Sequence, residues 1–297
     1  MKYLKIPLDY EQQITMLKER GLIVPDKKLA INYLKNISYF RLVNYLRPME
    51  RDKELHLYKP NSSFENAITL YSFDKELRGI IFAAIQSIEI ALRSKIIHYV
   101  SLKYGAFWFM DSSLFKNQNV YEQVIISIKN ELIRSKEDFI IEHNSKYTVP
   151  SMPPIWKTLE VTSFGTLSKL FCNIKDNAVK KQIAREFNIP QHIILESWVK
   201  CAVSMRNYIA HHSRVWNRNF PIMPQCNASF RGEWIKNTDF PPMKLYPQLC
   251  YIQYMQKQIC NNWDFKQRLK TLLKQYANVD IVAMGFPLDW ENEPLWR

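Results

Sequence analysis

The chain has 297 residues, 47% of them hydrophobic, which is enough for the core of one large domain or of two closely packed ones. No run approaches the roughly 18 apolar residues of a transmembrane helix, which argues against a membrane-spanning protein. The net charge of +13 and the aromatic content of 13% favour nucleic acid as a partner, because basic surfaces attract phosphate and unpaired bases stack on aromatic rings.

The composition favours helices, because glycine is scarce, with 6 residues, and Leu, Ile, Lys and Glu are abundant. In the N-terminal region, Asp9 and Asp26 are of the residue type that caps helix starts, and Gly21 suits a helix end. The expected helices are Asp9–Arg20, Asp26–Ser38 and Phe40–Leu46, and a polar loop with two prolines follows at 48–61.

The longest periodic segment runs from Ser62 or Ser63 to Tyr104, with apolar residues at helical spacing. The proline-rich stretch at 148–154 is the clearest linker candidate in the chain. On either side of it, the apolar pattern predicts further helices. They are expected at 121–143, at 155–174 despite Gly165, from Asp176 to Phe187, and from Gln191 to Ser213.

The last part of the chain is less regular. Residues 219–247 contain five prolines and are predicted to form an irregular excursion, and 249–276 supply one or two helices. The acidic, aromatic tail is expected to pack against the body, because its rings would otherwise expose apolar surface. We predict an all-α fold with an N-terminal helical region at 1–60, a helical core at 61–220, and a C-terminal part at 221–297 that packs on the core.

The cysteines give no sign of a structural disulfide or zinc site, because there are five of them and no C-x-x-C pair. The N-terminus lacks the long apolar segment of a signal peptide. We therefore expect a cytoplasmic location and no contact with the membrane. The sequence also lacks a P-loop, a glycine-rich nucleotide motif and an H-x-x-x-H pair, so we expect neither a metal nor a cofactor.

The segment Met205–Phe220 concentrates the side chains that can carry chemistry. Histidine transfers protons near neutral pH and a guanidinium holds negative charge, a combination that suits chemistry on a phosphodiester. Spacing alone does not select this segment, because an arginine stands five residues before a histidine in three places: Arg51/His56, Arg93/His98 and Arg206/His211. Context favours the last, since the first lies in a charged loop and Arg93 follows Glu89 by one helical turn.

Helical geometry separates Arg206 from His211, because five positions turn a helix by about 140°. Asn207 and His211 share a face, so we expect Asn207 to hydrogen-bond to the imidazole and orient it. Arg206 reaches His211 if its long side chain swings over, if the helix ends and bends between them, or if two copies of the chain meet across a dimer. The alternative without catalysis is a capped helix end with a structural histidine.

The sequence resembles the Abi family of bacterial phage-defence proteins, the AbiD/AbiF group of abortive-infection proteins. The resemblance spans nearly the whole chain. The most specific parts are the S-F-G at Ser163–Gly165 and the final block, R-N-x-x-A-H-H-x-R-x-W-N-R-x-F. The similar segments are Gln13–Asp26, Asn32–Leu42, Leu70–Arg78, Ile88–Arg93, Trp156–Ser168 and Ser197–Phe220.

The family is similar to HEPN proteins, all-helical domains whose Arg-x-x-x-x-His motif cleaves RNA without metal, usually as dimers. The resemblance therefore implies a HEPN-like helical bundle with additional N-terminal helices and an irregular, proline-rich excursion. It implies catalytic roles for Arg206, Asn207 and His211. Candidate supporting or RNA-binding residues in the same block are His212, Arg214, Trp216, Asn217 and Arg218.

The function implied is that of a phage-defence toxin, a metal-independent RNA endonuclease acting by 2′-OH attack. The resemblance also implies a homodimer and a cognate noncoding RNA that holds the toxin in check. One alternative is a non-catalytic RNA-binding protein that forms a ribonucleoprotein with its own structured RNA. Another is a protein-binding defence adaptor, which the charge of +13 disfavours.

Overall fold

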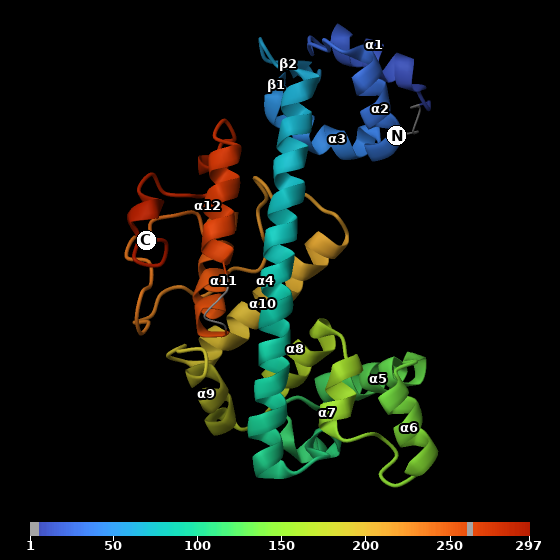
Figure 1. The fold of residues 1–297 in the computed structure, drawn as a ribbon, viewed down its shortest axis with the longest axis vertical. Helices are drawn as coiled ribbons and strands as arrows, with labels where there is room; N and C mark the ends of the chain where they lie inside the picture. Colours follow the sequence, from blue (N-terminus) through green and yellow to red (C-terminus); the bar gives the residue numbers. More distant parts are fainter. Residues whose placement is uncertain (1–5, 260–263) are drawn as a thin grey trace. The chain divides into compact units, whose positions relative to one another are not determined.

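A computed structural model describes residues 6–259 and 264–297 and shows a helical protein (Figure 1). These residues form twelve α-helices and one two-stranded hairpin, so the predicted all-α class is confirmed. The helices are α1 (Tyr10–Glu19), α2 (Lys27–Ile37), α3 (Tyr39–Leu46), α4 (Phe64–Tyr104), α5 (Gln118–Arg134), α6 (Asp138–Lys146), α7 (Ile155–Thr158), α8 (Phe164–Asn173), α9 (Asn177–Arg185), α10 (His192–Ala210), α11 (Leu245–Ile259) and α12 (Phe265–Gln275). The hairpin pairs β1 (Glu50–Asp52) with β2 (Leu57–Tyr58).

The chain forms two compact units. Unit 1 extends to Arg78 and includes Leu272–Val279, and unit 2 comprises Gly79–Thr271 and Asp280–Arg297. The division into regions 1–60, 61–220 and 221–297 stays a prediction.

Unit 1 begins with short helices whose starts are set by aspartates. Asp9 and Asp26 each accept a hydrogen bond from the backbone N–H three residues on, at 2.8 and 2.9 Å. These bonds satisfy amides that a helix start leaves without a partner. The apolar faces of the helices then meet in a core that buries Leu17, Leu34 and Leu42. The three helices predicted here are confirmed, and the loop predicted at 48–61 contains the hairpin.

A buried polar cluster links α3 to α4 inside unit 1. The hydroxyl of Tyr45 donates to Asp74 at 2.8 Å, and Arg78 forms an ion pair with the same carboxylate one turn along α4. Arg78 also donates to the Tyr45 hydroxyl at 3.2 Å. Burial, with the charge of Asp74, raises the pKa of Tyr45 well above its usual value. The segment Leu70–Arg78 therefore has a structural role in this chain.

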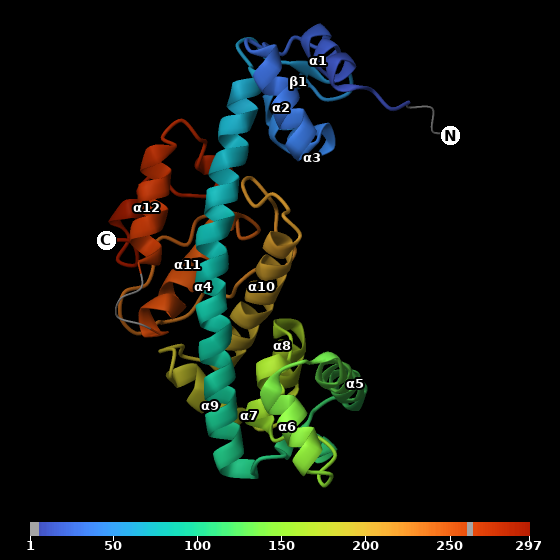
Figure 2. The same ribbon diagram turned by 45° about the vertical axis from the view of Figure 1, so that its right-hand side comes forward.

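Unit 2 is organised around the remainder of α4, whose apolar stripe is fully buried. Ile81, Ile85, Ile88, Leu92 and Ile96 recur at three or four positions, which places them on one face of the helix. Within the unit α8 packs against both α5 and α10, and α10 also packs against α9 (Figures 1 and 2). These contacts hold α10 in place, the helix at whose end the segment Met205–Phe220 begins.

The single helix predicted at 121–143 is wrong, because the structure has two helices there. α5 ends at Arg134 and α6 begins at Asp138. Ser135 and Glu137 adopt extended backbone angles between them. The intervening S-K-E carries no apolar side chain, so no core contact holds a helical turn together at this point.

The helix predicted over 155–174 is also broken. α7 ends at Thr158 and is followed by a short 3₁₀ turn that ends at Val161, and α8 begins at Phe164. The break follows from Ser163, whose hydroxyl accepts a hydrogen bond from the Thr166 N–H at 3.3 Å and caps the new helix. The S-F-G segment is therefore a helix start rather than a helix interior.

The excursion after α10 is irregular as predicted, with no helix between 219 and 244. It is nevertheless packed through its aromatic rings. Phe230 and Trp234 stack on Trp198 of α10, with centroids 5.3 and 5.6 Å apart. The predicted docking of the C-terminal tail is also confirmed, because Trp290 and Trp296 are buried and meet edge to face.

Two further sequence features can be compared with the structure. Cys172, Cys201, Cys226 and Cys250 are free thiols, and Cys260 lies outside the described residues. In the part of the chain that the structure describes, no helix combines the length and apolarity needed to span a bilayer.

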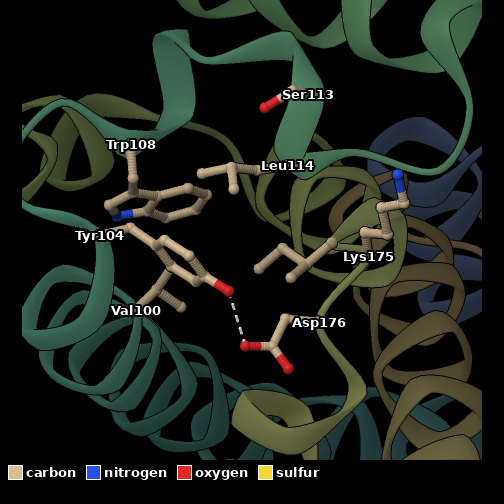
Figure 3. A pocket seen from close by; sticks show the side chains of 8 residues that line it. Val100, Tyr104, Trp108, Ser113, Leu114, Lys175 and Asp176 are labelled. Atoms are coloured by element: carbon tan, nitrogen blue, oxygen red, sulfur yellow. Dashed lines mark hydrogen bonds between the residues drawn. The ribbon is translucent and has the colours of Figure 1, made fainter.

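Asp176 ties the end of α4 to the start of α9 (Figure 3). Its carboxylate accepts hydrogen bonds from Lys103 at 2.6 Å and from the Tyr104 hydroxyl at 2.8 Å, and it caps α9 through the Ala178 N–H. Burial raises the pKa of Asp176, but these hydrogen bonds outweigh it and lower the pKa to about 2. The adjoining cavity of about 210 Å³ has mainly apolar walls. Asp176, which lines it, already accepts hydrogen bonds from Lys103 and Tyr104, so the cavity offers little to a polar ligand.

The sign of this pKa shift gives a testable prediction. A carboxyl whose pKa is lowered by folding stabilises the protein above its unfolded pKa, and the stabilisation is lost as pH falls from about 4 towards 2. Asp176→Asn keeps a capping side chain but removes the charge, so its urea midpoint should fall less than the wild-type midpoint between pH 6 and pH 3. Asp176→Ala also loses the cap, at a cost of about 1 kcal/mol at pH 6. Equal pH dependence in wild type and Asp176→Asn would contradict this assignment.

Candidate active site at the end of helix α10

The end of α10 is a sharply defined helix stop. His211 is the C-cap, and His212 has a φ of 55°, in the left-handed region that usually holds glycine. The Ser213 N–H donates to the Tyr208 carbonyl at 2.8 Å, and the His212 N–H donates to the Ile209 carbonyl at 2.9 Å. This pair of bonds is a Schellman motif, which satisfies the last carbonyls of the helix and turns the chain away from its axis.

The helix stop separates the three residues assigned to catalysis. Arg206 and Asn207 belong to the last full turn of α10, whereas His211 lies just beyond it with its side chain exposed. Arg206 donates to the Asn207 side chain at 3.2 Å. The expected hydrogen bond between Asn207 and the imidazole is not formed among the described residues, although the His211 N–H donates to the Asn207 carbonyl at 3.1 Å. The helix predicted from Gln191 to Ser213 ends earlier, at Ala210. Of the alternatives left open for Arg206 and His211, a helix end between them is therefore present, and whether they act together stays a prediction.

Arg218 and Arg214 have structural contacts in the loop that follows. The Arg218 guanidinium lies 3.9 Å from the centroid of the Tyr208 ring and donates to the Arg214 carbonyl at 3.2 Å. Arg214 lies over the ring of Trp216, at 5.8 Å. The two arginines therefore brace the loop against the last turn of α10, and both remain partly exposed.

Trp216 and Asn217 fasten the same loop to distant parts of unit 2. Trp216 is buried, and its indole N–H donates to the carbonyl of Asp280 at 3.1 Å. Lys244 donates to the Asn217 side chain at 2.9 Å. A buried ring cannot serve as a stacking platform for a base, so the structure gives Trp216 a supporting role.

Two residues of α4 extend the site beyond the segment that the sequence singled out. Arg93 pairs with Glu89 at 2.9 Å and donates to the Thr162 carbonyl, just before α8, at 3.0 Å. Burial raises the pKa of Glu89, and the charges of Arg93 and Arg206 offset part of that rise. Glu89 thus lies within electrostatic reach of Arg206. The sequence predicted only the Glu89–Arg93 pair, and the one further signal was the similarity at Ile88–Arg93.

The two other arginine–histidine pairs have different surroundings. His56 lies 3.1 Å from Glu50 in the hairpin of unit 1. Arg93 is engaged by Glu89 and the Thr162 carbonyl, while His98 contacts the Tyr99 ring. Within the described residues, His, Cys, Asp and Glu side chains do not gather in groups of three that could hold a metal ion.

The left-handed backbone of His212 gives a prediction about stability. At a φ of 55° any residue with a Cβ is strained relative to glycine, by about 1 kcal/mol. His212→Gly should therefore be about 1 kcal/mol more stable than His212→Ala in urea unfolding, since both variants lack the ring and only one keeps the strain. If the two variants unfold at the same urea concentration, the helix does not end as described.

Comparison with known proteins identifies the family. The model of the Abi-like protein family matches residues 32–217, which include α4 to α10 and the whole stretch from Arg206 to Asn217. No curated protein and no solved structure matches the chain. Membership of this family suggests a part in abortive infection, a form of phage defence. The match covers well over half of the sequence, and the chain therefore belongs to the Abi-like protein family.

Proposed function

We propose that this chain is a HEPN-type toxin of phage defence that cleaves RNA without a metal ion. The observation that carries the proposal is the end of α10, which combines a partly exposed guanidinium at Arg206 with an exposed imidazole at His211. In the described residues, no hydrogen bond engages the His211 ring. The ring is therefore free to exchange a proton with a substrate.

In the proposed reaction, the 2′-oxygen of RNA attacks the adjacent phosphorus and the 5′-oxygen of the next nucleotide leaves. His211 takes the proton from the 2′-OH or gives one to the leaving oxygen. Arg206 holds the non-bridging oxygens as negative charge develops on them. Asn207 keeps the guanidinium in place through the 3.2 Å hydrogen bond. The products are a 2′,3′-cyclic phosphate and a 5′-OH.

The reaction needs one group to take a proton and another to give one. Each chain supplies one His211, with His212 next to it, so a homodimer that brings two helix ends together would supply both roles. We also propose that a cognate noncoding RNA restrains the toxin by covering this site. His212 and Arg214, next to the site, then contact RNA in the substrate or in the inhibitor.

Substitutions at the site test the proposal directly. Arg206→Ala and His211→Ala should each reduce cleavage of single-stranded RNA by at least about 100-fold in buffer with EDTA, because each removes a transition-state interaction. Both variants should retain the wild-type circular dichroism spectrum, since neither side chain is buried. Arg51→Ala and His56→Ala form the matched control, with the same spacing in unit 1, and should cleave at the wild-type rate.

Two results would count against this function. One is cleavage that persists in both site variants, and the other is activity that disappears when EDTA is added to the wild type. A wild-type protein that copurifies with a structured RNA and never cleaves would instead identify the non-catalytic RNA-binding protein.

The chemistry of the substrate gives a second test. A single 2′-deoxynucleotide placed 5′ to the cleaved phosphate should abolish cleavage at that bond and leave other bonds unaffected, because the attacking oxygen is missing. Mass spectrometry of the products should show a 2′,3′-cyclic phosphate or its 3′-phosphate hydrolysis product. Cleavage at the deoxy position, or a 5′-phosphate product, would require water as the nucleophile and contradict the mechanism.

A further inference from the structure

A groove with both polar and apolar walls opens between α8 and α10, next to the proposed active site. It has a volume of about 550 Å³, and its walls include Ser163, Gly165 and Lys169 of the α8 segment, and Lys200 and Asn207 of α10. Asn207 is the residue that holds Arg206. The groove and the site are therefore continuous along one helix.

The groove follows one stripe of α10. Val203, Ser204 and Asn207 lie three, four and seven positions after Lys200, which places them on one face of the helix, and His211 follows Asn207 by four more positions. The seven steps along the helix from Lys200 to Asn207 rise by about 10 Å. A single nucleic acid strand carries more than one phosphate over that distance, so a strand that lies in the groove leads to His211.

The positive charge of the groove comes from its two lysines. Lys169 and Lys200 are both exposed, and in the described part of the chain neither forms an ion pair. The start of α8 is already supplied with a carboxylate, because the Thr166 hydroxyl donates to Glu131 at 3.2 Å. The lysines, and not the helix end, therefore give the groove its attraction for a polyanion.

Gly165 has no reason within the protein to be a glycine. Its φ lies outside the left-handed region, and a Cβ added to it would meet no atom within 4 Å. Gly165 lies in the first turn of α8, so it does not carry the full cost of roughly 0.5–1 kcal/mol that glycine has in the middle of a helix, but no contact inside the protein requires it there. The groove is the space that a side chain at this position would enter, and a ligand backbone that passes close to α8 would need it empty.

We propose that this groove binds the backbone of single-stranded RNA and leads the strand to His211. Lys169 and Lys200 bind phosphates, and Gly165 lets the strand approach α8. The proposal rests on the proposed function for its substrate class, and it adds the path along which that substrate reaches the site.

Binding to an RNA that cannot be cleaved tests the groove separately from the reaction. The probe is a fluorescent 2′-O-methyl oligonucleotide of about 12 nucleotides, measured by anisotropy between about 50 and 200 mM salt. Lys169→Gln/Lys200→Gln should bind about tenfold more weakly, and the slope of log affinity against log salt should fall by about 1.4. Lys129→Gln/Lys181→Gln is the matched control, with the same change of charge at exposed lysines outside the groove, and should bind like the wild type.

The glycine gives an independent arm of the test. Gly165→Ala should be at least as stable as the wild type in urea, because the added Cβ meets no atom, and yet bind the probe several-fold more weakly. Gly79→Ala is its control, because a Cβ there also meets no atom within 4 Å but the position lies outside the groove. It should gain stability without losing affinity.

The outcomes separate the groove from the reaction. Wild-type affinity and salt slope in the groove lysine variant, or a wild type that does not bind the probe, would overturn the groove. RNA cleavage by the wild type that is unaffected in the groove variants leaves the proposed function standing and rejects the groove. If the probe binds through the groove and the wild type cleaves no RNA, the groove stands and the proposed function is rejected.

Discussion

The way α10 ends is the constraint on which the candidate site depends. A straight helix would place Arg206 and His211 about 140° apart. The Schellman motif stops the helix at Ala210 and makes His211 its cap, and the exposed imidazole therefore stands at the helix end while Arg206 lies within the helix. His212 takes the strained backbone position that makes this turn possible. Strained residues of this kind persist where the surroundings hold them, and they are frequent at functional sites.

The distribution of arginine contacts explains why residue type alone is a poor guide to function in this chain. Arg78 is buried with Asp74, Arg93 joins α4 to the segment before α8, and Arg218 covers the ring of Tyr208. These guanidinium groups stabilise the fold through directed hydrogen bonds and ring contacts. Arg206 differs, because its side-chain hydrogen bond is with Asn207, an exposed neighbour on the same helix turn.

Local sequence patterns predicted the helices with capping residues and long apolar stripes, such as those begun by Asp26 and Asp176. They failed where a break depends on small polar residues within an apolar pattern, as at Ser135 and Ser163. The candidate site was proposed from residues of a single segment, and it stays a prediction. The buried position of Trp216, the proximity of Glu89 to Arg206 and the groove beside Gly165 depend on packing between segments far apart in the chain, which spacing does not report.

The loop after α10 is held by hydrogen bonds from residues that lie outside the stretch matched by the family. The stretch shared with the Abi-like family ends at residue 217, yet Trp216 and Asn217 are held by Asp280 and Lys244. Residues outside the shared stretch therefore hold the loop that follows the candidate site in place. Substitutions in that outer part can therefore shift the loop, and with it the surface beside Arg206 and His211, without changing either of these residues.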